Sequence, residues 1–303
     1  MTRSTVPATR ILSVAAIILA TTCITGATIH AVAAPVPFAA IAPLDPPELD
    51  AGTLVRTALD KIGGKSWDAI KSYESVATVQ SAMGDGRIEF QFIAPDARRL
   101  VQTMPGGGSK MELGSVGSSA WMGEPGRARA VDPKMAEELA GGGDLLTLVR
   151  SIDTRFTDFK LLGKDTVEGV SCFRISMRPT QSPAPEVRWT LYMNAADATI
   201  VGLDVPPPPS DLAPNAPVQG GQSIRFRRWE PVERPAPAAP QPKAAPAAAE
   251  PRLLAFREAT VTTAGMKVDL VYSKVAVDTL AKGAIAPPAG IEPAPGQSSP
   301  SRP

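Results

Sequence analysis

Residues 170–193, VSCFRISMRPTQSPAPEVRWTLYM, contain two runs in which apolar and polar residues alternate. Every second position of each run is a large apolar residue: Phe173, Ile175, Met177, Val187, Trp189, Leu191 and Met193. A period of two is typical of a β-strand with one buried face and one face in water. The stretch therefore predicts two strands that present their large side chains to the same interior.

The same alternation recurs along the chain, at 88–92, 224–227 and 266–272. Gly84–Gly86 and Glu168-Gly169 separate neighbouring runs, as the turns of β-hairpins do. Alternation repeated this often predicts an antiparallel sheet of about ten to eleven strands with one apolar face.

Helical periodicity is confined to short segments. Apolar residues at spacings of three and four predict a helix that ends at Gly63-Gly64; they are Leu54, Val55, Ala58, Leu59 and Ile62. A short further turn is expected to hold Trp67, Ile70 and Tyr73. Two more helices are predicted in the middle of the chain, one opened by Pro133 and one capped by Asp144 that covers 145–152.

So large a sheet with so few helices is expected to curl rather than stay flat. The predicted fold class is mainly β (α+β), a curved antiparallel sheet or incomplete β-barrel with an N-terminal helix. The hollow of such a sheet is either an apolar ligand pocket or a filled core. Periodicity leaves both alternatives open.

The N-terminus has the pattern of a secretory leader. Arg3 and Arg10 precede an apolar run at 11–20, and small residues follow up to Ala34. We expect residues 1–34 to be a signal peptide for secretion across the inner membrane into the periplasm. The alternatives are an uncleaved anchor at 11–29 and lipidation at Cys23.

Proline-rich stretches divide the rest of the chain. We expect a spacer at 35–49 and one folded domain at 50–285. Extended insertions at 206–221 and 231–251 interrupt that domain, and a Pro/Ser-rich tail follows at 286–303.

Composition argues against several classes of function. Lys and Arg number 31 against 30 Asp and Glu, a balance that argues against nucleic acid as a partner. The single His, His30, lies in the leader, and two Cys are too few for a metal cluster. No nucleophile-elbow or phosphate-loop spacing occurs, so we expect no catalytic residue, no metal and no cofactor. Cys172 is expected to be a packing residue.

Several short motifs follow one another in a set order. They are ALDKIGG at 58–64 before Trp67 and Ile70, FIAPDAR at 92–98, ELGSVGSSAWMGEP at 112–125, LLGKDTVEGV at 161–170, the stretch 192–205, and PPAGI at 287–291. This order resembles that of the periplasmic outer-membrane lipoprotein-sorting proteins with the LolA/LolB-like fold. The resemblance covers most of residues 50–291.

The resemblance implies an incomplete barrel whose cavity receives acyl chains under a helical lid, for transport or sorting of a lipid or an acylated lipoprotein. Each buried methylene is worth about 0.8 kcal/mol, so a long chain would bind without specific polar contacts. The candidate cavity residues are Phe90, Phe92, Leu100, Trp121, Phe173, Ile175, Trp189 and Leu191. The candidate lid residues are Met135, Leu139, Leu145, Leu148 and Val149.

The alternative function is a structural or interaction module of the cell envelope with a filled core and no ligand. Its partner would be another envelope protein. Contact with the membrane is expected to be transient, or to run through an uncleaved N-terminus.

Overall fold

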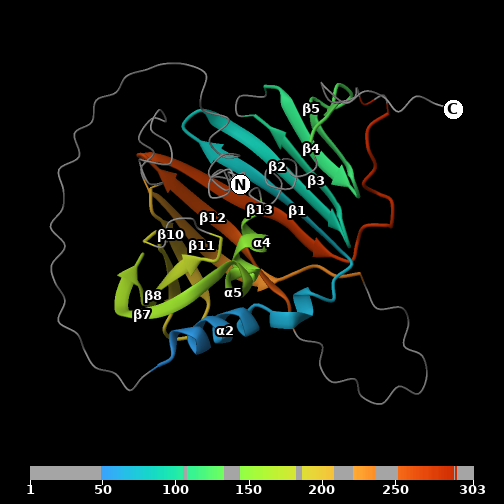
Figure 1. Cartoon of the computed structure of the whole chain (residues 1–303). Helices are drawn as coiled ribbons and strands as arrows, with labels where there is room; N and C mark the ends of the chain where they lie inside the picture. Colours follow the sequence, from blue (N-terminus) through green and yellow to red (C-terminus); the bar gives the residue numbers. More distant parts are fainter. Residues whose placement is uncertain are drawn as a thin grey trace, which may run out of the picture.

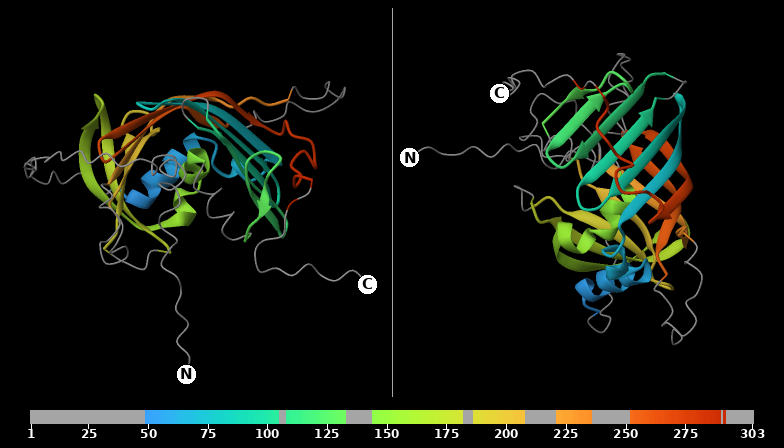
Figure 2. Two further views of the ribbon diagram at one scale, coloured as in Figure 1. Left: turned by 90° about the horizontal axis from the view of Figure 1, so that it is seen from above. Right: turned by 90° about the vertical axis from the view of Figure 1, so that its right-hand side faces the viewer.

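One antiparallel sheet makes up most of the molecule. The computed structural model describes residues 49–104, 108–132, 144–181, 186–207, 221–235, 252–289 and 291. In these residues thirteen strands pair in the order β6-β5-β4-β3-β2-β1-β13-β12-β11-β10-β9-β8-β7. The sheet is open and strongly curved, and two of the helices, α4 (Leu145–Arg150) and α5 (Ile152–Arg155), lie inside the curve (Figures 1 and 2). The predicted fold class is confirmed, with more strands than the ten to eleven expected.

The sheet consists of two meanders, β1 to β6 and β7 to β13, that are joined by the pairing of β1 with β13. The first six are β1 (Ser72–Ser81), β2 (Gly84–Ile93), β3 (Ala97–Thr103), β4 (Lys110–Val116), β5 (Ser119–Gly123) and β6 (Arg129–Ala130). The other seven are β7 (Phe156–Val167), β8 (Val170–Pro179), β9 (Trp189–Asn194), β10 (Ile200–Val205), β11 (Gln222–Pro231), β12 (Leu254–Thr263) and β13 (Met266–Val277). Because β1 pairs with β13, the edges of the sheet are β6 and β7.

The register places the predicted apolar positions on one face. Three of the cross-strand pairs are Phe90 with Leu100, Ile175 with Leu191, and Met177 with Trp189. All six residues belong to one cluster of buried hydrophobic side chains, which we call the main core. The alternation read from the sequence therefore identifies the concave face correctly.

The two predicted turns have different outcomes. The turn at Glu168-Gly169 is confirmed. The other chain reversal lies at Ala82-Met83, and Gly84 to Gly86 already pair with β1 inside β2. The prediction was wrong by two residues. The Oγ atom of Ser81 accepts the backbone N–H of Met83 at 3.2 Å and donates to the carbonyl of Gly84, which favours the earlier turn.

The N-terminal helix is α2 (Ala51–Lys61), capped by the side chain of Asp50. Gly63 follows it with φ of 121°, a value that favours glycine, and the short 3₁₀ helix η2 (Gly64–Trp67) comes next. Tyr73 was expected in this turn, but it lies in β1. The backbone N–H of Leu254 donates to the carbonyl of Ile62, which fixes the end of α2 to β12.

The helix predicted at 145–152 is two helices. They are α4 (Leu145–Arg150), capped by Asp144 as expected, and α5 (Ile152–Arg155). Ser151 ends the first and begins the second, because its hydroxyl donates to the carbonyl of Thr147 in place of a continued helical turn. α4 and α5 lie within the curve of the sheet, whereas α2 runs across its lower end (Figures 1 and 2).

At two of the predicted boundaries, residues expected outside the domain pair or pack with it. Pro231 ends β11 and Glu233 forms a bridge with Ala276, so the first residues of the expected insertion at 231–251 pair with the sheet. At the C-terminus, Ile291 of the expected tail packs beside Ile285. The leader at 1–34 and most of the 35–49 spacer lie outside the described residues. Within the described part of the chain, the helices are too short or too polar to cross a membrane.

Candidate functional site

Most of the predicted cavity residues come together in the main core. Five of them are buried members of it: Phe90, Leu100, Ile175, Trp189 and Leu191. Phe92 and Phe173 are partly buried and pack against it. These seven side chains come from β2, β3, β8 and β9, on both sides of the β1–β13 pair.

Trp121 is the exception. It is buried in a separate cluster that it shares with Ile93, Ala97, Ala128 and Ile285. Its indole N–H donates to Oε1 of Glu112 at 3.1 Å. Trp121 pairs with Gly114, and a Cβ atom at Gly114 would lie 2.1 Å from the Trp121 ring. The structure therefore keeps Trp121 apart from the other cavity candidates, in a small core of its own.

An ion pair with two hydrogen bonds lies beside Trp121. Arg99 donates to both carboxylate oxygens of Glu112, each at 3.1 Å. Burial acts to raise the pKa of Glu112, but the hydrogen bonds from Arg99 and Trp121 outweigh it and hold this pKa below its usual value.

The candidate lid lies deep in the concavity. Leu145, Leu148 and Val149 are buried members of the main core, so α4 fills the middle of the hollow rather than standing above it. Met135 and Leu139, the two remaining lid candidates, lie outside the described residues.

A buried carboxylate begins α4. Asp144 accepts the backbone N–H groups of Leu146 and Thr147 at 3.2 and 3.1 Å, and it also accepts the Thr147 hydroxyl. The Tyr73 hydroxyl donates to Asp144 at 3.4 Å. Burial nevertheless raises the pKa of Asp144 above its usual value.

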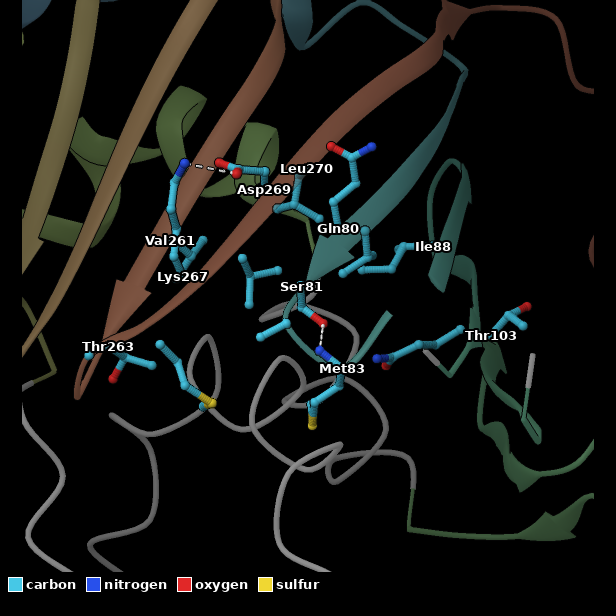
Figure 3. A pocket seen from close by; sticks show the side chains of 16 residues that line it. Gln80, Ser81, Met83, Ile88, Thr103, Val261, Thr263, Lys267, Asp269 and Leu270 are labelled. Atoms are coloured by element: carbon cyan, nitrogen blue, oxygen red, sulfur yellow. Dashed lines mark hydrogen bonds and ion pairs between the residues drawn. The ribbon is translucent and has the colours of Figure 1, made fainter. Parts of the chain in front are cut away.

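An apolar pocket lies at the end of the sheet where two hairpins turn. Its volume is about 500 Å³, and we call it the hairpin pocket (Figure 3). Apolar side chains on four of its strands line it: Val79, Ile88, Val261, Val268 and Leu270. The β1–β2 turn adds Met83 and the first residue of β13 adds Met266, which are 50% and 37% exposed.

Charged groups are few at this pocket. Nζ of Lys267 lies 2.9 Å from Oδ2 of Asp269, which neutralises both charges (Figure 3). None of the predicted cavity residues lines the hairpin pocket. The alternating runs contained Ile88, Met266, Val268 and Leu270, but only the pairing of β1 with β13 shows that they meet.

A second pocket of about 600 Å³ opens between α2, η2 and the α4–α5 segment. We call it the arginine pocket, because Arg56, Arg150 and Arg155 line it together with Lys65. Phe92 is the one predicted cavity residue in its lining.

The described residues hold no group of three or more His, Cys, Asp or Glu side chains that could bind a metal ion. Cys172 is buried beneath the other face of the sheet with Val167, Tyr192 and Val201, and burial raises the pKa of its thiol. A buried, protonated thiol is a weak nucleophile, as expected for a packing residue.

Comparisons with known proteins identify a group of similar folds. No family model and no curated protein sequence matches the chain. Among solved structures, it is similar to a LolA superfamily protein from Nitrosomonas europaea, at 10% identity and a TM-score of 0.46, over 79% of this chain and 99% of that one.

Two further solved structures are similar to this chain. One is a DUF1329 family protein from Desulfovibrio piger, at 13% identity and a TM-score of 0.45, covering 78% of this chain and 97% of that one. The other is a putative outer-membrane lipoprotein-sorting protein domain from Vibrio parahaemolyticus, at 11% identity and a TM-score of 0.42, covering 76% and 92%.

Proposed function

We propose that this protein is a non-catalytic carrier of the cell envelope that binds the acyl chain of a lipid or lipoprotein in its curved sheet. The observation that carries the proposal is the hairpin pocket with two exposed methionines at its mouth. Only four large hydrophobic side chains are exposed among the described residues, and this one pocket holds two of them.

The lining suits an acyl chain better than a polar ligand. Its floor is formed by aliphatic side chains, and its one close ion pair neutralises the charges at the rim. Ten buried methylenes would contribute about 8 kcal/mol before the cost of immobilising the ligand. Methionine at the mouth can adapt to different chains because its side chain is unbranched and polarisable.

We further propose that α4 acts as a lid. Its buried side chains belong to the main core, as do Phe90, Leu100 and Leu191. Movement of α4 out of the hollow would uncover these side chains and lengthen the site beyond the hairpin pocket. Met135 and Leu139 remain predicted members of this lid.

The proposed setting is the periplasm, reached through the leader at 1–34, with the folded domain at 50–285 carried on the 35–49 spacer. The protein would contact the membrane transiently, or stay anchored through residues 11–29.

The test is a pair of charges at the mouth of the pocket. Met83→Glu combined with Met266→Glu should abolish binding of a fluorescent fatty acid, because a carboxylate at each position disfavours an apolar chain. Both side chains are exposed, so the far-ultraviolet circular dichroism and the unfolding free energy should stay near those of the wild type.

Leu162→Glu is the matched control. Leu162 is 47% exposed on β7 and does not line the hairpin pocket, so this variant should bind like the wild type. Unchanged binding by the double variant would remove the hairpin pocket from the site. No binding by the wild type would favour the structural or interaction module.

A further inference from the structure

The arginine pocket lies apart from the hairpin pocket and shares no lining residue with it. Its floor is apolar and comes from Leu59, Ile62, Trp67, Ile70 and Phe92. Its walls combine four basic and three acidic residues, Arg56, Lys65, Arg150, Arg155, Asp60, Asp68 and Asp153, which leaves one net positive charge, 4 − 3 = +1.

The positive charge lies deeper than the negative charge. Arg150 and Arg155 are partly buried, whereas the three aspartates of the lining are exposed to solvent. Charges in water are screened far more than charges beside an apolar floor. The potential inside the pocket is therefore dominated by the two arginines.

These two arginines differ from several arginines of the sheet. Several guanidinium groups of the sheet are paired with a carboxylate: Arg99 with Glu112, Arg188 with Asp158, Arg225 with Asp204, and Arg227 with Glu168. Within the described part of the chain, Arg150 and Arg155 form no ion pair within 4.0 Å. Arg150 instead lies over the ring of Trp67, at 5.5 Å from the ring centre.

Charges of both signs surround Arg155. Burial lowers the pKa of Arg155, and the nearby charges of Arg98 and Arg150 act in the same direction, while that of Asp144 opposes them. The carboxylate of Asp144 accepts hydrogen bonds from the backbone N–H groups of Leu146 and Thr147 at the N-terminus of α4. The pocket thus presents two guanidinium groups that feel the charge of Asp144 but form no ion pair within 4.0 Å with a described residue.

We propose that the arginine pocket binds a phosphate group carried by an amphiphile, with the guanidinium groups of Arg150 and Arg155 donating to the phosphate oxygens. Guanidinium matches phosphate because its planar fork donates two parallel hydrogen bonds. The apolar side chains of the floor, among them Trp67 and Phe92, contact the hydrocarbon next to the phosphate. This site does not rest on acyl-chain binding in the hairpin pocket.

Calorimetric titration of the full chain with three probes tests the proposal. The probes are short-chain dihexanoyl phosphatidate, the neutral dihexanoylglycerol with the same chains, and inorganic phosphate. The double variant Arg150→Gln, Arg155→Gln should bind phosphatidate at least about tenfold more weakly and leave dihexanoylglycerol unaffected. Arg129→Gln is the control, because Arg129 is exposed on β6 and lines neither pocket.

Two further measurements test the proposal even if the double variant does not fold. Arg155→Lys keeps the charge and should retain part of the affinity. For the wild type, added sodium chloride should weaken binding of phosphatidate but not of dihexanoylglycerol.

The outcomes are distinct. Phosphatidate affinity in the folded double variant within about twofold of the wild type, or no salt dependence in the wild type, would overturn the proposal. Equal affinity for inorganic phosphate and phosphatidate, both lost in the double variant, would support the phosphate site and replace the amphiphile by free phosphate. A wild-type protein that binds phosphatidate but not dihexanoylglycerol would count against the proposed carrier and leave this site in place.

Discussion

At the scale of single residues, Asp144 connects the sheet to the proposed lid. Its carboxylate holds the first turn of α4 and accepts the hydroxyl of Tyr73 from β1. Burial raises its pKa although each of these hydrogen bonds favours the ionised form. The native state therefore binds a proton at this site more tightly than the unfolded chain does.

A pH dependence of stability follows from this raised pKa. Between the usual value of 3.8 and the raised native value, the folded protein holds more protons than the unfolded chain, so this group lowers the unfolding free energy as pH rises. Asp144→Asn keeps a capping oxygen and removes the charge. The unfolding free energy of Asp144→Asn relative to the wild type should therefore increase from acid to neutral pH in urea denaturation.

Asp144→Ala is the control for the cap itself. It lacks the capping oxygen and should be about 1 kcal/mol less stable than Asp144→Asn at neutral pH. An advantage of Asp144→Asn that stays constant or shrinks as pH rises would contradict the assignment of a costly buried charge.

Sequence reasoning reached Asp144 but failed for Trp121, and the difference is physical. A cap is a local device, and the residues that follow Asp144 show it. Trp121 stands beside Met122 in a strand where both faces are partly covered, and the two side chains pack against different cores. Periodicity does not decide which of two adjacent apolar residues faces the hollow.

At the scale of elements, α4 is held by packing rather than by its own length. Six residues form less than two turns, and a helix this short is not stable alone. Leu148 is 2% exposed, with its neighbours in the main core.

Leu148→Ala tests whether α4 is a lid. The cavity it leaves should lower the unfolding free energy by about 2–5 kcal/mol. If α4 must move before an acyl chain binds along the hollow, the same change should speed uptake of a fluorescent fatty acid in stopped-flow measurements. Leu162→Ala, at an exposed position of β7, should alter neither quantity. Slower or unchanged uptake by a folded Leu148→Ala would argue that α4 is a fixed part of the core.

Element boundaries were predictable where local signals agreed. The strands with strict alternation and the turn at Glu168-Gly169 follow from residues close in sequence. The break at Ser151 and the turn at Ala82-Met83 depend on single side-chain hydrogen bonds to the backbone, which the apolar pattern does not encode.

At the scale of the whole molecule, curvature brings distant segments into one site. The alternating runs were enough to predict a curled sheet with an apolar concave face. The hairpin pocket was not predictable, because it needs the pairing of β1 with β13, which sets the β1–β2 turn beside the β12–β13 turn. The alternating pattern predicts which residues lie on the concave face, whereas the long-range pairing decides which of them line a pocket.

The central claim is that the curved sheet carries an acyl chain. Native mass spectrometry of the protein purified from its own cell envelope tests this claim most directly. The Met83→Glu, Met266→Glu double variant and the Leu162→Glu control are measured in parallel. The account predicts extra mass from a co-purifying acyl species on the wild type and on Leu162→Glu, and none on the Met83→Glu, Met266→Glu double variant. A wild-type protein with a ligand-free mass that also takes up no fluorescent fatty acid would contradict it.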